Sequence, residues 1–182
     1  MKRALSTVGF MTVASAFVSL PFSFARAEEY VVIDAAEAAQ LGAAVGGDEI
    51  RKIDNGDATF DIVHLFTSTG NGALDFSSGS AIVANSGTAL VIGGGGGGNG
   101  NCGGGGGAGG LIDLENLAFT KSTTLTVNVG EGGASVAGNT TNSNNGQPTT
   151  FVLDGTTYTA NGGGGGGGWT SGGTGDNSAG KE

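Results

Sequence analysis

The chain is poor in the residues that build reactive or cross-linked sites. Its 182 residues include one cysteine, one histidine and two prolines. A lone cysteine, Cys102, forms no internal disulfide, which excludes a small domain held together by disulfides. Zinc sites need a cluster of histidine, cysteine or carboxylate side chains, and the sequence brings none together. We therefore expect no catalytic residues, no metal site and no cofactor.

Positive charge is also scarce. The chain has seven lysine and arginine residues against sixteen aspartate and glutamate residues, for a formal net charge of −9. Nucleic acids and anionic membrane surfaces attract clusters of basic residues, which this chain lacks. We therefore expect a solvated acidic exterior and no nucleic-acid partner.

The first 27 residues have the pattern of a signal peptide. Lys2 and Arg3 give a basic start, and Ala25-Arg26-Ala27 supplies the small-x-small pattern before a cleavage site. The uncharged stretch between them would also suit an uncleaved membrane anchor, but serine and threonine residues dilute it. The sequence predicts a signal helix over residues 1–27, cleaved to leave a secreted or cell-surface protein. The membrane is then a partner only through this segment, before cleavage.

Three further regions follow the predicted signal peptide. Residues 28–56 are expected to be a spacer with one short helix, because 35–41 are mostly strong helix formers and Asp34 is a suitable N-cap. Residues 57–169 are predicted to form a glycine-rich β domain. Residues 170–182 are expected to be a flexible polar tail.

The predicted β domain contains apolar and alternating segments that are typical of strands. They are 59–67, 81–84, 88–92, 123–129, 151–153 and 156–160. Asn85-Ser86-Gly87 and Asp154-Gly155 are turn sequences, the second typical of a two-residue hairpin. Residues 113–119 are the one segment of this domain that could form a helical turn, and 138–150 are expected to form a surface loop. The predicted fold class is all-β.

Three runs of glycine, at 93–98, 103–107 and 162–168, adjoin these strands and admit three interpretations. The first run satisfies the G-x-G-x-x-G pattern of a dinucleotide-binding turn, but more glycine follows in place of the required helix. A flexible linker is the second interpretation, because glycine loses much conformational entropy on ordering. Linkers normally join domains and contain serine, however, whereas each run here adjoins apolar residues.

The third interpretation makes the runs a packed interior. Extended glycine chains form the left-handed polyproline II helix, which has three residues per turn and no internal hydrogen bonds. Several such helices bond to one another through their peptide groups, because no side chain holds them apart. We favour this interpretation, a short-stranded β-sandwich-like frame around a bundle of polyglycine II helices. It predicts that Gly95→Val destabilises the domain.

The order of several motifs carries a family resemblance. The pieces are Asp61 to Thr67, Ala89 to Gly98, Gly103 to Leu111, Thr124 to Gly133, Phe151, and Gly162 to Gly168. In this order they resemble a glycine-rich domain of exported bacterial proteins and phage tail-fibre tips. The resemblance implies a β-framed polyglycine bundle used for display or ligand contact, not for catalysis. Domains of this kind usually continue with further glycine runs, whereas this chain stops soon after Trp169.

Two side chains each allow two interpretations of their role. His64 alternates with apolar residues and has no nucleophile motif beside it, which favours a structural role over a catalytic one. Trp169 closes the last glycine run and either caps the bundle or contacts a ligand, and we favour the cap. Residues 172–176 approach a calcium-binding repeat, but the pattern does not recur.

The sequence supports three hypotheses about function. The first is an exported, non-catalytic structural or adhesive module whose partner is a cell-surface or extracellular protein or glycan. The second is an ice- or carbohydrate-binding module, which requires an outward row of threonine or alanine that the glycine runs lack. The third is a truncated fragment of a larger surface protein, such as an autotransporter-like or tail-fibre-like adhesin. An enzyme is the class for which the sequence offers no residues.

Overall fold

A computed structural model describes two compact units. The described residues are 7–9, 30–56, 58–77, 84–100, 103–120, 122–137 and 141–168. The first unit contains a short helix and a six-stranded sheet, except for residues 91–92 and 111–113 of that sheet. The second unit contains those residues, the glycine runs and a four-stranded sheet, of which only Leu74 falls in the first unit. The expectations for Cys102, Trp169, the tail at 170–182 and most of the signal helix lie outside the described residues.

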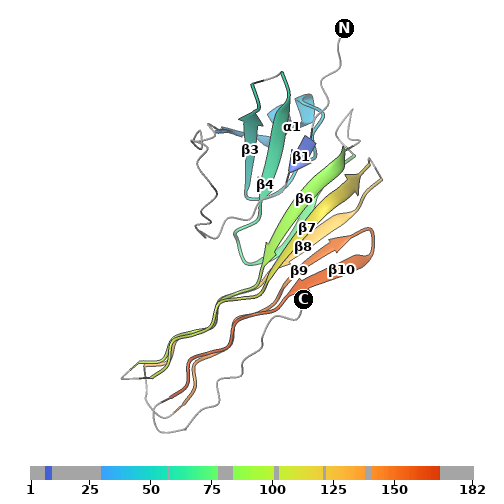
Figure 1. Cartoon of the computed structure of the whole chain (residues 1–182). Coiled ribbons are helices and arrows are strands. Elements are labelled where there is room, and N and C mark those ends of the chain that lie inside the picture. The colour runs from blue at the N-terminus through green and yellow to red at the C-terminus, as the bar shows by residue number, and fades with distance from the viewer. Residues whose placement is uncertain are drawn as a thin grey trace, which may run out of the picture. The chain divides into compact units, whose positions relative to one another are not determined.

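The first unit is built on a sheet with the strand order β2-β3-β4-β1-β6-β7. Its strands, labelled in Figure 1 where there is room, are β1 (Thr7–Gly9), β2 (Tyr30–Ile33), β3 (Glu49–Asp54), β4 (Phe60–Leu65), β6 (Ala84–Ile92) and β7 (Leu111–Phe119). Strands β2, β3 and β4 pair antiparallel, and β1 pairs parallel with both β4 and β6. The signal helix predicted over residues 1–27 is therefore wrong at residues 7–9, where pairing with β4 and β6 favours an extended backbone.

Helix α1 (Ala35–Gln40) confirms the short helix expected near the start of the chain. It begins after the N-cap Asp34, whose carboxylate accepts a hydrogen bond from the backbone N–H of Glu37 at 2.8 Å. Ala38 is fully buried in a core that includes Ile33 and Ile62. The segment 28–56 differs from the expected spacer, because β2 and β3 join the sheet beside β4. Their β-branched valine and isoleucine residues favour strands.

Two local expectations for the first unit are wrong. Residues 85–87 lie within β6 and form no turn, and residues 113–119 lie within β7 and form no helical turn. In both places pairing with a neighbouring strand overrides a weak local preference. The end of β7 is held in the core by Phe119, which is fully buried and stacks on Phe76 with 5.4 Å between ring centroids.

The second unit contains a four-stranded sheet with the order β10-β9-β8-β5. Its strands are β5 (Gly70–Leu74), β8 (Leu125–Val129), β9 (Thr149–Leu153) and β10 (Thr156–Ala160). The predicted hairpin is confirmed, since β9 and β10 pair antiparallel around Asp154-Gly155. Both turn residues have positive φ, 46° and 82°, as a type I′ turn requires.

Five extended segments of the second unit lie beside one another, and together we call them the polyglycine bundle. They are segment 1 (93–100), segment 2 (103–110), segment 3 (130–137), segment 4 (141–148) and segment 5 (161–168). Each is continuous with one strand: segments 1, 3 and 5 follow β6, β8 and β10, whereas segments 2 and 4 precede β7 and β9. In Figure 1 they are the narrow ribbons that run side by side beyond the strands.

Hydrogen bonds between segments recur at every third residue. The N–H groups of segment 1 donate to carbonyls of segment 2 in the pairs Gly93–Gly110, Gly96–Gly107 and Asn99–Gly104. Those of segment 2 donate to segment 5 in the pairs Gly104–Gly167, Gly107–Gly164 and Gly110–Asn161. These six bonds measure 2.6–2.9 Å. A β-strand would repeat every second residue, whereas the polyproline II helix repeats every third.

The predicted all-β fold with a polyglycine II bundle is therefore confirmed, but the bundle is larger than the three glycine runs. Segments 3 and 4 belong to it although most of their residues carry side chains. The expected surface loop over 138–150 is accordingly wrong for residues 141–148, which form segment 4. Segment 1 is hydrogen bonded to each of the other four segments.

Candidate functional site

At several glycine positions the bundle interior leaves no room for a side chain. A Cβ atom placed on Gly96 would lie 2.0 Å from the carbonyl oxygen of Gly164, and one on Gly97 would lie 2.2 Å from that of Ala134. These distances are far inside van der Waals contact. Glycine is required here because two backbones approach each other directly, without any positive φ.

Other positions of the same runs are open. A Cβ atom on Gly98 or Gly105 would meet nothing within 4 Å, and one on Gly95 would have its nearest neighbour at 3.7 Å. Ala108 lies three residues after Gly105, on the same side of a three-residue helix, and its side chain is exposed. The reason for expecting Gly95→Val to destabilise the domain is therefore wrong, because residue 95 is exposed and the blocked positions of this run are 93, 94, 96 and 97.

Side chains of segment 4 supply hydrogen bonds to its neighbours in the bundle. Asn145 Oδ1 accepts from the N–H of Gly165 at 2.7 Å, and Asn142 Oδ1 accepts from that of Gly168 at 3.1 Å. The buried Ser143 hydroxyl donates to a carbonyl of segment 1 at 2.9 Å. Sequence reasoning missed these roles, although the Asn-x-x-Asn spacing matches the three-residue repeat and could have indicated them.

His64 lies in the core of the first unit, on β4. Only 2% of its surface is exposed, and its Nδ1 lies 2.9 Å from the carbonyl oxygen of Gly46, to which it donates in the neutral ring. Burial lowers the pKa of His64 and outweighs the opposing effect of this hydrogen bond. The imidazole is therefore neutral at pH 7, and its placement supports the structural role over the catalytic one.

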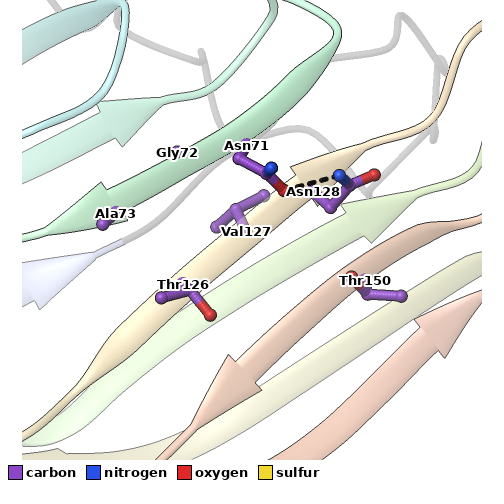
Figure 2. Close-up of a pocket in the computed structure, with 7 residues that line it drawn as sticks. All are labelled: Asn71, Gly72, Ala73, Thr126, Val127, Asn128 and Thr150. Carbon is purple, nitrogen blue, oxygen red and sulfur yellow. Dashed lines mark hydrogen bonds between the residues drawn. The ribbon is translucent and has the colours of Figure 1, made fainter.

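A groove lies on the four-stranded sheet, with a volume of about 520 Å³. Figure 2 shows the residues that line it, which come from β5, β8 and β9: Asn71, Gly72, Ala73, Thr126, Val127, Asn128 and Thr150. Asn128 Nδ2 donates a hydrogen bond to Asn71 Oδ1 at 2.7 Å. Sequence reasoning missed this site, because the two asparagines are 57 residues apart and the β8–β5 pairing cannot be read from a local pattern.

The described residues contain neither a candidate metal-binding cluster nor a candidate membrane-spanning helix. Across residues 30–168, apart from the gaps in that range, no three histidine, cysteine, aspartate or glutamate residues are grouped so that they could hold a metal ion. In the part of the chain that the structure describes, no helix is both long and apolar enough to cross a membrane.

The fold and the bundle define a glycine-rich, mostly β protein in which peptide groups, and not side chains, fill part of the interior. The glycine-rich domain family matches residues 67–182, and the chain belongs to this family. All five bundle segments lie within the matched range, whereas the motif that begins at Asp61 lies almost entirely before it. Neither the curated proteins nor the solved structures contain a match.

Proposed function

We propose that the chain is an exported, non-catalytic module that acts as a rigid support and adhesive element on a cell surface or in the extracellular medium. The observation that carries this proposal is the polyglycine bundle. Its five segments are cross-linked by peptide hydrogen bonds, and its blocked positions exclude side chains. An interior of this kind holds a shape but presents no reactive group, so contact with a partner falls to the surface.

Two further observations support the proposal. The pattern of residues 1–27, from the basic start to Ala25-Arg26-Ala27, is typical of an export signal. The one histidine of the chain is buried in the first unit, and its pKa is lowered, which does not suit proton transfer with a substrate in solvent. A setting in a bacterial surface protein or a phage tail fibre is part of this proposal.

Export is tested by expressing the full chain in a bacterium and measuring the intact mass and the location of the product. We expect a secreted or surface-bound protein that begins at Glu28. Ala25→Phe removes the small residue that the cleavage pattern requires, so this variant should accumulate with residues 1–27 attached. A cytoplasmic wild-type product that retains these residues would contradict the proposal.

Adhesion is tested by comparing cells that display the full chain with cells that display a variant lacking residues 67–182. We expect the full chain alone to retain cells on an immobilised extracellular matrix or on a second cell type. Equal retention of both populations would refute the adhesive part of the proposal, while leaving export untouched.

A further inference from the structure

The four-stranded sheet of the second unit is uncharged. Strands β5, β8, β9 and β10 contain no aspartate, glutamate, lysine, arginine or histidine. This is unexpected in a chain with sixteen acidic and seven basic residues. The surface residues of these strands are instead mainly threonine and asparagine, whose side chains both donate and accept hydrogen bonds.

The strand register places these residues in rows across the solvent-exposed side of the sheet. Asn128, Thr150 and Thr159 are directly paired across β8, β9 and β10. Asn71 of β5 extends this row through its hydrogen bond with Asn128. Neighbouring strands lie about 4.8 Å apart, so the row offers hydroxyl and amide groups at short, regular intervals. The glycine runs lack an outward row of threonine, but the sheet thus carries an outward row of two asparagines and two threonines.

The groove lies over part of this row and has unused hydrogen-bonding capacity. The hydrogen bond between the two asparagines uses Asn128 Nδ2 as donor and Asn71 Oδ1 as acceptor. Within the described part of the chain, Asn71 Nδ2 and Asn128 Oδ1 make no other side-chain bond. The groove lining therefore contains one amide donor, on Asn71, and one amide acceptor, on Asn128, together with the Thr126 and Thr150 side chains (Figure 2).

These features select among classes of ligand. Nucleic acids and other polyanions need basic side chains, and the groove has none. An extended peptide would add to a sheet edge through backbone bonds, whereas this groove lies across strands and is lined by side chains. Its volume of about 520 Å³ is within the range of roughly 300–1,000 Å³ that small-molecule sites occupy. A neutral molecule with closely spaced hydroxyl groups fits all three conditions.

We infer that the groove binds a neutral oligosaccharide, with Asn71 and Asn128 as the central hydrogen-bonding pair. This inference rests on the proposed adhesive function, for which it names the class of ligand. None of the lining residues is aromatic, so no ring is available to stack on a sugar. Binding through exposed amides and hydroxyls alone is weak at one site, and adhesion then comes from many copies acting together.

The inference is tested with the purified full chain, labelled with ¹⁵N, and a panel of soluble hexasaccharides. Maltohexaose, cellohexaose and chitohexaose are the neutral probes, and hexagalacturonate is the anionic control. We expect at least one neutral probe to shift the backbone signals of β5, β8 and β9 and the side-chain amide signals of Asn71 and Asn128. The affinity should not depend on salt concentration, because no charges pair.

Variants separate the groove from other surfaces. Asn71→Asp keeps the acceptor for Asn128 Nδ2 but removes the free amide donor, and Thr150→Ala removes one hydroxyl. Each should weaken binding roughly two- to tenfold, the factor that corresponds to one net hydrogen bond. Thr156→Ala is the matched control, because Thr156 is exposed at the hairpin turn and does not line the groove. It should leave the affinity unchanged.

Three outcomes would overturn the inference. The first is the absence of any shift with all neutral probes at high millimolar concentration. The second is a set of shifts confined to residues outside the groove. The third is inhibition of ice growth that is lost in Asn71→Asp, without saccharide binding, which would make this asparagine and threonine row an ice-binding surface. Because the titration uses purified protein, these outcomes are independent of the export and cell-retention experiments.

Discussion

Replacing Gly96 with alanine should destabilise the second unit, whereas the same change two residues later should not. The added Cβ of residue 96 would lie 2.0 Å from the carbonyl oxygen of Gly164, so segments 1 and 5 must move apart by about 1 Å or more. At residue 98 the added Cβ would meet nothing within 4 Å. The two substitutions have the same chemistry and lie in the same glycine run, so only the packing differs.

The expected magnitude follows from the bonds between segments 1 and 5. Gly163 N–H donates to Gly94 O and Gly166 N–H donates to Gly97 O, each at 2.8 Å, and both would stretch beyond useful hydrogen-bond length. Losing two net hydrogen bonds should lower the free energy of unfolding by about 1–3 kcal/mol. Gly98→Ala should raise it by about 0.4–1 kcal/mol, because alanine restricts the unfolded chain more than glycine does.

Urea denaturation of the full chain, followed by circular dichroism, measures both changes. The slope with denaturant should stay the same, so that the shift in midpoint reports stability. In a thermal melt, the Gly96→Ala loss corresponds to a midpoint lowered by roughly 2–12 °C. A flexible linker would respond alike at both positions. Equal effects of Gly96→Ala and Gly98→Ala, of either sign, would refute the bundle packing described above.

Three further predictions concern other residues. Asn145→Ala should speed hydrogen exchange of the Gly165 amide measured by NMR, with a loss of about 0.5–1.5 kcal/mol in stability, whereas Asn145→Asp, which keeps the acceptor, should preserve protection. Burial lowers the folded-state pKa of His64 below the ordinary value of 6.5, so the folded state binds this proton less readily than the unfolded state does. The fold is therefore most stable above pH 6.5 and loses this contribution as the pH falls below 6.5. The urea midpoint of the wild type should drop between pH 7 and 5 more than that of His64→Gln. Gly155→Ala should cost about 1–2 kcal/mol in the same assay, because φ is +82° there, and an unchanged midpoint would argue against the type I′ turn.

The fold was predictable from the sequence wherever a local pattern determined the structure. The helix at 35–40 followed from its N-cap, and the hairpin followed from Asp154-Gly155, where both residues adopt positive φ. The polyglycine bundle followed from the placement of pure glycine runs beside strands. In each of these places the preference of the residues and the final structure agree.

The sequence-based predictions were wrong where partners far along the chain determine the conformation of a segment. Residues 113–119 have no strong strand signal, and β7 exists because it pairs in a sheet and buries Phe119 against Phe76. Segment 4 is polar and looks like a loop, but its peptide groups and asparagine side chains find partners in glycine runs far along the chain. The groove could not be predicted at all, because β5 and β8 are brought together only by the topology.

The three-residue repeat of the bundle also places its open positions at regular intervals along the axis. Open positions recur once per turn, which is about 9 Å along the axis. Examples are Gly95 and Gly98 in segment 1, and Gly105 and Ala108 in segment 2. A side chain introduced at such a position would stand at a fixed spacing from its neighbours whatever its chemistry, because packing does not depend on it. Side chains at these open positions can therefore be changed, by evolution or by design, while the bundle beneath keeps the same fold.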